Sequence, residues 1–133
     1  MTTELYWLTL TVLMTALFWV PYVLDRYILR GVWPALSDTR PEGGGPQSLW
    51  AQRAIRAHQN AVENLAIFVP AVLTAALLHI STPAARMAVV AYFFARLAHF
   101  IVYTSGIPVM RTLFFTVGWA AQLIILFSIL GWM

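Results

Sequence analysis

The sequence predicts an all-α integral membrane protein, built as an antiparallel bundle of four transmembrane helices. Hydrophobic residues make up 61% of its 133 residues and charged residues only 10%, far below the roughly 25% of a typical soluble domain. Four apolar stretches, each close to the roughly 20 residues that cross a bilayer, cover residues 5–24, 61–80, 84–103 and 113–130. We therefore expect a single four-helix domain over residues 1–133, in contact with the lipid bilayer.

The first span ends near Pro21 and the polar pair Asp25 and Arg26, where the helix leaves the hydrocarbon. A signal peptide begins with basic residues, and none precedes this span. We therefore expect the span to stay in the protein. A loop over residues 31–49 follows, rich in turn-forming residues. It is the one soluble segment that the sequence predicts.

The second helix is predicted to begin after Ser48, a suitable N-cap residue, and to become apolar only at Leu65. Pro70 lies inside this helix and has no N–H to donate to the carbonyl of Ala66, so we expect a kink. The third helix should begin at Pro83 with Thr82 as its N-cap. The sequence around Pro108 predicts the start of the fourth helix in the same way. The connections between the second, third and fourth helices are short, so consecutive helices must be antiparallel neighbours.

The arginines indicate the orientation in the membrane. Arg111 lies between the third and fourth spans, and Arg86 is alone at the opposite end. The first connection holds Arg26, Arg30, Arg40, Arg53 and Arg56. By the positive-inside rule, the first and third connections are cytoplasmic and both termini lie on the far side. The formal charge of +3 therefore reflects topology, and we expect no nucleic-acid partner.

The second helix carries a polar stripe into the membrane. At about 100° per residue, one face of this helix holds Arg53, Arg56, Asn60 and Glu63. Two guanidinium groups, an amide and a carboxylate suit a zwitterionic, peptide-like ligand. Alternatively, Glu63 and an arginine of a neighbouring helix neutralise each other and lock the bundle, and the spacing leaves both options open. His58 falls on another face, where we expect it to pack with a hydrogen bond to a loop or helix.

The third helix repeats this pattern with Arg96, His99 and Tyr103, spaced i, i+3 and i+7. Arg96 is interpreted as the counter-ion of Glu63 or as a ligand of a carbonyl oxygen. Tyr103 is either a ligand contact or a residue of the aromatic belt. Arg111 is either an anchor at the membrane surface or a cation that lowers the pKa of a ligand thiol.

Other site classes are excluded by what the sequence lacks. Without cysteine, the chain has neither a disulfide nor a thiol nucleophile of its own. It also lacks a phosphate-binding glycine loop and the His-Glu-x-x-His motif. The three histidines are far apart in the predicted bundle, so we expect no metal site. A transporter is disfavoured because the sequence shows no repeat.

The segment from Arg53 to Asn64 resembles the signature of the MAPEG family, the membrane-associated proteins in eicosanoid and glutathione metabolism. Phe94–His99, Tyr103 and Arg111 are similar to that family's third- and fourth-helix pattern. The resemblance implies a homotrimer that binds glutathione as co-substrate between subunits, while small lipophilic electrophiles approach from the bilayer. The family's activities include glutathione transfer and glutathione-dependent peroxidase and isomerase reactions.

The same resemblance implies a role for each residue at a matching position. Arg56, Asn60 and Glu63 would hold the glutathione backbone. His99 and Tyr103 would line the site, Arg111 would stabilise the thiolate, and Arg53 and Arg96 would be supporting charges.

Two positions depart from better-known members: Gln59 stands where some of them have a basic residue, and Phe115 where some have a tyrosine that contacts glutathione. The compact chain resembles the bacterial branch, which implies the bacterial inner membrane, with the 31–49 loop cytoplasmic. We expect a glutathione-dependent transferase or peroxidase, and the alternative is a non-catalytic binding or scaffold protein of the same fold.

Overall fold

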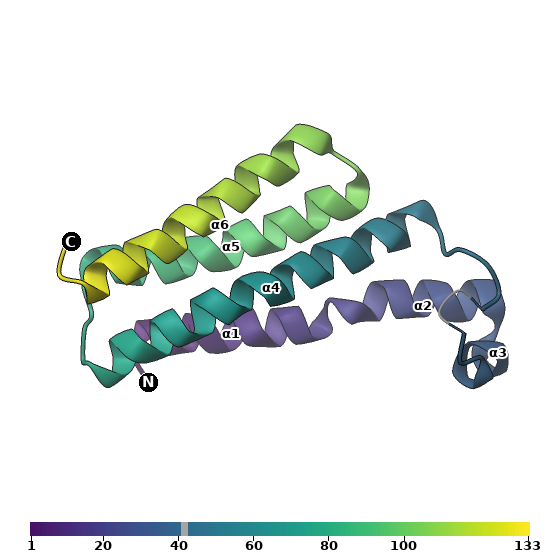
Figure 1. Ribbon diagram of the computed structural model, residues 1–133, viewed down its shortest axis with the longest axis horizontal. Coiled ribbons are helices and arrows are strands. Elements are labelled where there is room, and N and C mark those ends of the chain that lie inside the picture. Colours follow the sequence, from purple (N-terminus) through teal and green to yellow (C-terminus); the bar gives the residue numbers. More distant parts are fainter. Residues whose placement is uncertain (41–42) are drawn as a thin grey trace.

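The computed structural model describes residues 1–40 and 43–133, and within them the regular secondary structure is all α-helix, with no strand. Four segments are long and apolar enough to cross a membrane: Thr3–Arg30, Leu49–Leu77, Pro83–Ser105 and Pro108–Ile129. They run antiparallel, and both termini lie at the same end (Figure 1). The predicted four-helix fold is therefore confirmed.

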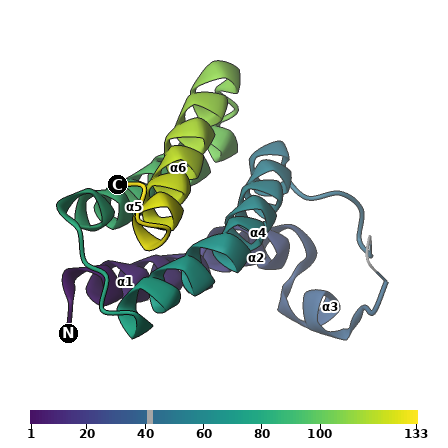
Figure 2. The same cartoon turned by 60° about the vertical axis from the view of Figure 1, so that its left-hand side comes forward.

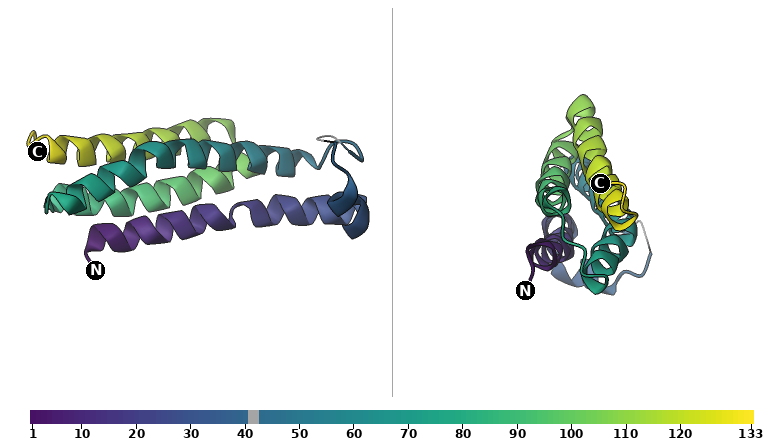
Figure 3. Two further views of the ribbon diagram at one scale, coloured as in Figure 1. Left: turned by 60° about the horizontal axis from the view of Figure 1, so that its bottom comes forward. Right: turned by 90° about the vertical axis from the view of Figure 1, so that its left-hand side faces the viewer.

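The first span is divided into two helices, α1 (Thr3–Leu17) and α2 (Trp19–Arg30). Pro21 explains the break at Phe18, because proline has no N–H to donate to the carbonyl of Leu17 and its ring crowds that carbonyl. Pro70, in contrast, lies inside the continuous helix α4 (Leu49–Leu77). Here the helix bends in its second half, as Figure 3 shows.

The predicted loop over residues 31–49 contains a short helix, α3 (Val32–Ser37), which the sequence did not indicate. Ser48 precedes α4 as expected, but its side chain does not cap that helix. Instead, Ser48 Oγ donates to Asp25 Oδ1 over 2.6 Å. The carboxylate of Asp25 thus ties the end of α2 to the start of α4.

The two remaining helices, α5 (Pro83–Ser105) and α6 (Pro108–Ile129), form a hairpin. Thr82 caps α5, since its side chain accepts from the N–H of Ala85 over 3.0 Å. Gly106 ends α5 with a left-handed φ of 82°, a conformation that favours glycine at a helix C-terminus. Figure 2 shows this hairpin standing as a pair beside α1 and α4.

The interior is packed by aromatic pairs and small residues. Phe68 stacks on Tyr92 with 3.7 Å between ring centroids, and Phe18 stacks on Phe100 at 4.0 Å. The inward face of α4 near its start carries buried alanines, which let neighbouring helices approach closely: Ala54, Ala57 and Ala61. Each follows a member of the polar stripe, so the stripe lies about 100° around the helix from this packed face.

Candidate functional site

The polar stripe of α4 divides into bonded and exposed members. Arg53 is half-buried, and its Nε donates to the carbonyl of Thr104 over 2.9 Å, which ties α4 to the end of α5. Arg56 and Glu63 are exposed. Neither makes an ion pair within the described part of the chain. The two charges are therefore available to a ligand or to another subunit.

Asn60 links this stripe to α5. Arg96 Nη2 donates to Asn60 Oδ1 over 2.6 Å, although Arg96 is only 2% exposed. The same nitrogen lies 3.5 Å from Nδ1 of His99, which is also buried. Nε and Nη1 of Arg96 have no hydrogen-bond partner among the described residues. A buried guanidinium thus has a neutral amide as its main partner.

Of the two alternatives for Arg96, the ion pair with Glu63 is absent within the described part of the subunit. Arg96 packs against α6, where a Cβ added at Gly118 would lie 3.3 Å from its Cδ. Glu63, in contrast, is on the exposed side of α4. The other expectation for Arg96, a carbonyl oxygen as partner, agrees with its bond to the side-chain carbonyl of Asn60.

Aromatic rings extend the contacts from His99 to α6. The His99 ring lies 5.5 Å from the ring of Tyr103 and 6.4 Å from that of Phe115, measured between centroids. The guanidinium carbon of Arg111 lies over the Tyr103 ring, 4.9 Å from its centroid. This distance is within the range of a cation–π contact. Arg111 is itself exposed at the start of α6.

The predicted site residues therefore fall into two sets. One is a chain of contacts across three helices, from α4 through α5 to α6: Asn60, Arg96, His99, Tyr103 and Arg111. The other set, Arg56 and Glu63, stays exposed on α4, while Arg53 binds the end of α5. Of these residues, Arg56, Glu63 and Arg111 are exposed, whereas Arg96 and His99 are buried.

Comparison with known proteins decides the family. A model described as the MAPEG family matches residues 5–131, nearly the whole chain. The chain belongs to the MAPEG family. No curated protein and no solved structure matches it at a significant level.

MAPEG membership confirms the resemblance carried by Arg53–Asn64, and the four apolar helices agree with an integral, multi-pass membrane protein. The family includes glutathione-dependent transferases and peroxidases as well as non-catalytic members.

A second set of polar contacts in this MAPEG subunit was not predicted from the sequence. Gln122 is 1% exposed, and its Nε2 donates to the carbonyl of Asn64 over 3.0 Å and lies 3.5 Å from Oη of Tyr92. Asn64 Nδ2 donates to the carbonyl of Asn60 over 2.8 Å. The feature of the sequence that could have indicated these contacts is Gln122, an amide side chain inside the apolar fourth span.

His58 packs as predicted. Its Nδ1 lies 2.8 Å from Oη of Tyr22, and its ring forms a T-shaped pair with that of Phe18, with 6.2 Å between centroids. This position is on the α2 side of α4, away from Arg96 and His99. The structure therefore gives His58 a role in joining α4 to α2.

Proposed function

We propose that the protein is a glutathione-dependent transferase or peroxidase that acts on lipophilic electrophiles, with the glutathione site between subunits of a homotrimer. The observation that carries the proposal is the exposure of Arg56 and Glu63 on a membrane-spanning helix. A charge at membrane depth costs roughly 2.5 to 3.5 kcal/mol on insertion scales, so such side chains face a partner or a wet cavity. A ligand between subunits would provide that environment.

The donors and acceptors match the chemistry of glutathione. Arg56 would bind a ligand carboxylate, Glu63 the ammonium group, and Asn60 a peptide group. Asn60 is held in one orientation for this role, since its Oδ1 already accepts from Arg96. His99 and Tyr103 would line the site from α5, and Arg53 and Arg96 would support it.

Arg111 would act on the thiol. A cation beside a thiol lowers its pKa from about 8.5, so more thiolate is present at neutral pH. Bound glutathione would supply this nucleophile, whose sulfur would bond to an electrophilic carbon as the leaving group departs with its electron pair. With a lipid hydroperoxide, the sulfur would instead attack the terminal oxygen, and the O–O bond would break to give the lipid alcohol and a glutathione sulfenic acid. A second glutathione would convert that acid to the disulfide and water. Arg111 is held over Tyr103, so its position is defined before any ligand binds.

Calorimetric titration of the detergent-solubilised protein with glutathione tests the proposal. We expect binding, an ultraviolet thiolate signal on the complex, and turnover of an aromatic halide or a lipid hydroperoxide. Arg111→Ala should remove the thiolate signal and leave most of the binding. Arg86→Ala is the matched control, because Arg86 lies in the first turn of α5, at the opposite end of the bundle. No heat of binding at millimolar glutathione would refute the proposal.

The second candidate is a non-catalytic binding or scaffold protein of the same fold. It is favoured by the contact between Arg111 and Tyr103, which gives the cation a partner without a ligand. Thermal unfolding separates the two functions, because a ligand that binds the folded state raises its stability. If glutathione leaves the melting temperature unchanged and Glu63→Gln lowers it equally with and without glutathione, the scaffold is the correct function.

A further inference from the structure

The short helix α3 has an apolar face that no other described part of the chain covers. Val32, Trp33 and Leu36 are 61%, 75% and 62% exposed, and their spacing places them on one side of the helix. Among the described helices, α3 contacts α2 alone. Figure 2 shows α3 to the side of the bundle, beyond the end of α2. Three large apolar side chains thus point away from the protein.

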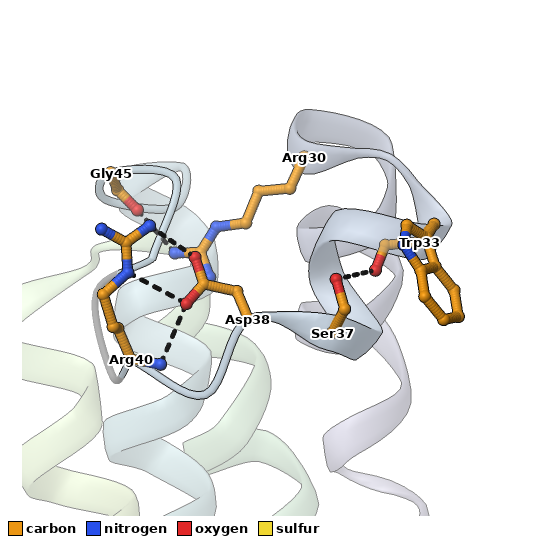
Figure 4. Close-up of polar contacts among 6 residues, drawn as sticks. All are labelled: Arg30, Trp33, Ser37, Asp38, Arg40 and Gly45. Carbon is orange, nitrogen blue, oxygen red and sulfur yellow. Dashed lines mark hydrogen bonds and ion pairs between the residues drawn. The ribbon is translucent and has the colours of Figure 1, made fainter.

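The loop after α3 folds back onto the end of α2. Arg30 Nη2 donates to the carbonyl of Gly45 over 2.5 Å, and Nε and Nη2 of Arg40 donate to the carboxylate of Asp38 over 3.0 and 2.8 Å. Figure 4 shows both guanidinium groups on one side of the loop, while the Trp33 ring points away from them. The polar groups are therefore bonded within the loop, and the apolar face stays outside.

The place of α3 in the chain sets its depth. Only Gly31 separates it from α2, so α3 begins where the first membrane-crossing segment ends. Tryptophan is enriched at the boundary between lipid and water. A helix with one apolar face lies in the plane of that boundary, and this geometry suits α3.

The same end of the bundle is basic. Its arginines are Arg26, Arg30, Arg40, Arg53, Arg56 and Arg111, and the carboxylates among the described residues of this end are Asp25 and Asp38. Positive charge exceeds negative charge, and basic residues close to a membrane surface attract anionic headgroups. The positive charge and the apolar face of α3 therefore both favour contact with an anionic membrane surface.

We propose that α3 is an interfacial anchor that binds anionic phospholipid, with Val32, Trp33 and Leu36 inserted among the lipids and the neighbouring arginines at the headgroups. The anchor fixes the depth of the bundle end at which Arg56 and Arg111 lie. It acts independently of any glutathione site.

The absence of cysteine from the chain allows a direct test. Single variants Trp33→Cys and Leu36→Cys, in the full-length protein, are labelled with an environment-sensitive fluorophore and placed in nanodiscs. Thr39→Cys is the matched control, since Thr39 is exposed in the same loop but outside α3. Quenching is then measured with lipids brominated near the headgroup and with aqueous iodide.

We expect blue-shifted emission at positions 33 and 36, with several-fold stronger lipid quenching and weaker iodide quenching than at position 39. This contrast should increase when phosphatidylglycerol replaces part of the phosphatidylcholine, and high salt should reduce the increase. Probes quenched by iodide as strongly as the control would overturn the anchor. Probes protected from both quenchers would also overturn it, because a second copy of the chain would then cover α3. Equal quenching in both lipid mixtures would overturn the preference for anionic lipid.

Discussion

Arg96 donates to the side-chain carbonyl of Asn60 across 2.6 Å while only 2% of Arg96 is exposed. The bond joins α5 to α4 in the polar part of the bundle, and no carboxylate among the described residues makes an ion pair with Arg96. A buried charge is stable only when its few hydrogen bonds are kept. The energetic role of Asn60 is thus to solvate a cation inside the protein.

Removing the amide of Asn60 should therefore destabilise the protein more than removing the charge of Arg96. Asn60→Leu leaves the guanidinium of Arg96 without its main partner, and we expect a loss of about 3 kcal/mol in the free energy of unfolding. Arg96→Met removes the charge together with its desolvation cost, so we expect a loss of less than about 1 kcal/mol. Reversible unfolding in mixed micelles measures both. Equal losses for the two variants would contradict a solvating role for Asn60.

The hydrogen bond between Gln122 Nε2 and the carbonyl of Asn64 makes a separate prediction. Gln122→Leu should lower stability by about 1 kcal/mol, the usual scale for a hydrogen bond between membrane helices. Tyr92→Phe is the control, because its hydroxyl lies at 3.5 Å from Gln122 and should contribute little. The same unfolding measurement applies, and a larger loss for Tyr92→Phe would contradict the assignment.

Gly106 is predicted to resist substitution for two reasons. Its φ is 82°, and an added Cβ would lie 3.1 Å from the guanidinium carbon of Arg53. The left-handed conformation alone costs an alanine about 1–2 kcal/mol, and the contact would displace Arg53 from the carbonyl of Thr104. Gly131→Ala is the control, since Gly131 has a φ of 74° and open space around it. We expect Gly106→Ala to be more destabilising in thermal unfolding, and equal effects would exclude the contact with Arg53.

The loop gives a prediction about pH. The hydrogen bonds from Arg40 lower the pKa of Asp38 to about 2. Because the folded-state pKa lies below the ordinary value of 3.8, the bonded carboxylate favours the folded loop above that value. This contribution is lost as pH falls through about 2. A carbon NMR titration of labelled aspartate measures the pKa directly.

Arg40→Gln should move the pKa of Asp38 back toward 3.8. Arg30→Gln should move it much less, because Arg30 acts on Asp38 only through its charge. Equal shifts for the two variants would show that the hydrogen bonds are not the main cause.

Much of the candidate site could be predicted from residue spacing. The spacing of Arg96, His99 and Tyr103 correctly predicted that the three residues lie on one side of a helix, because helical periodicity is a local property. The partner of Arg96 could not be predicted in this way, since Glu63 and Asn60 are less than one turn apart on α4. Helix rotation and depth choose between them, and both depend on packing between helices.

The membrane class, the four spans, the cap at Thr82 and the family could all be predicted from the sequence. Each depends on composition or on neighbours along the chain, where hydropathy and backbone chemistry act locally. The exposure of Trp33 on α3 could not be predicted in this way. Neither could the bond between Arg96 and Asn60 or the bond by which Gln122 joins α6 to α4. These contacts join residues far apart in sequence, and they form because buried alanines and stacked aromatic rings set the distance and rotation of the helices.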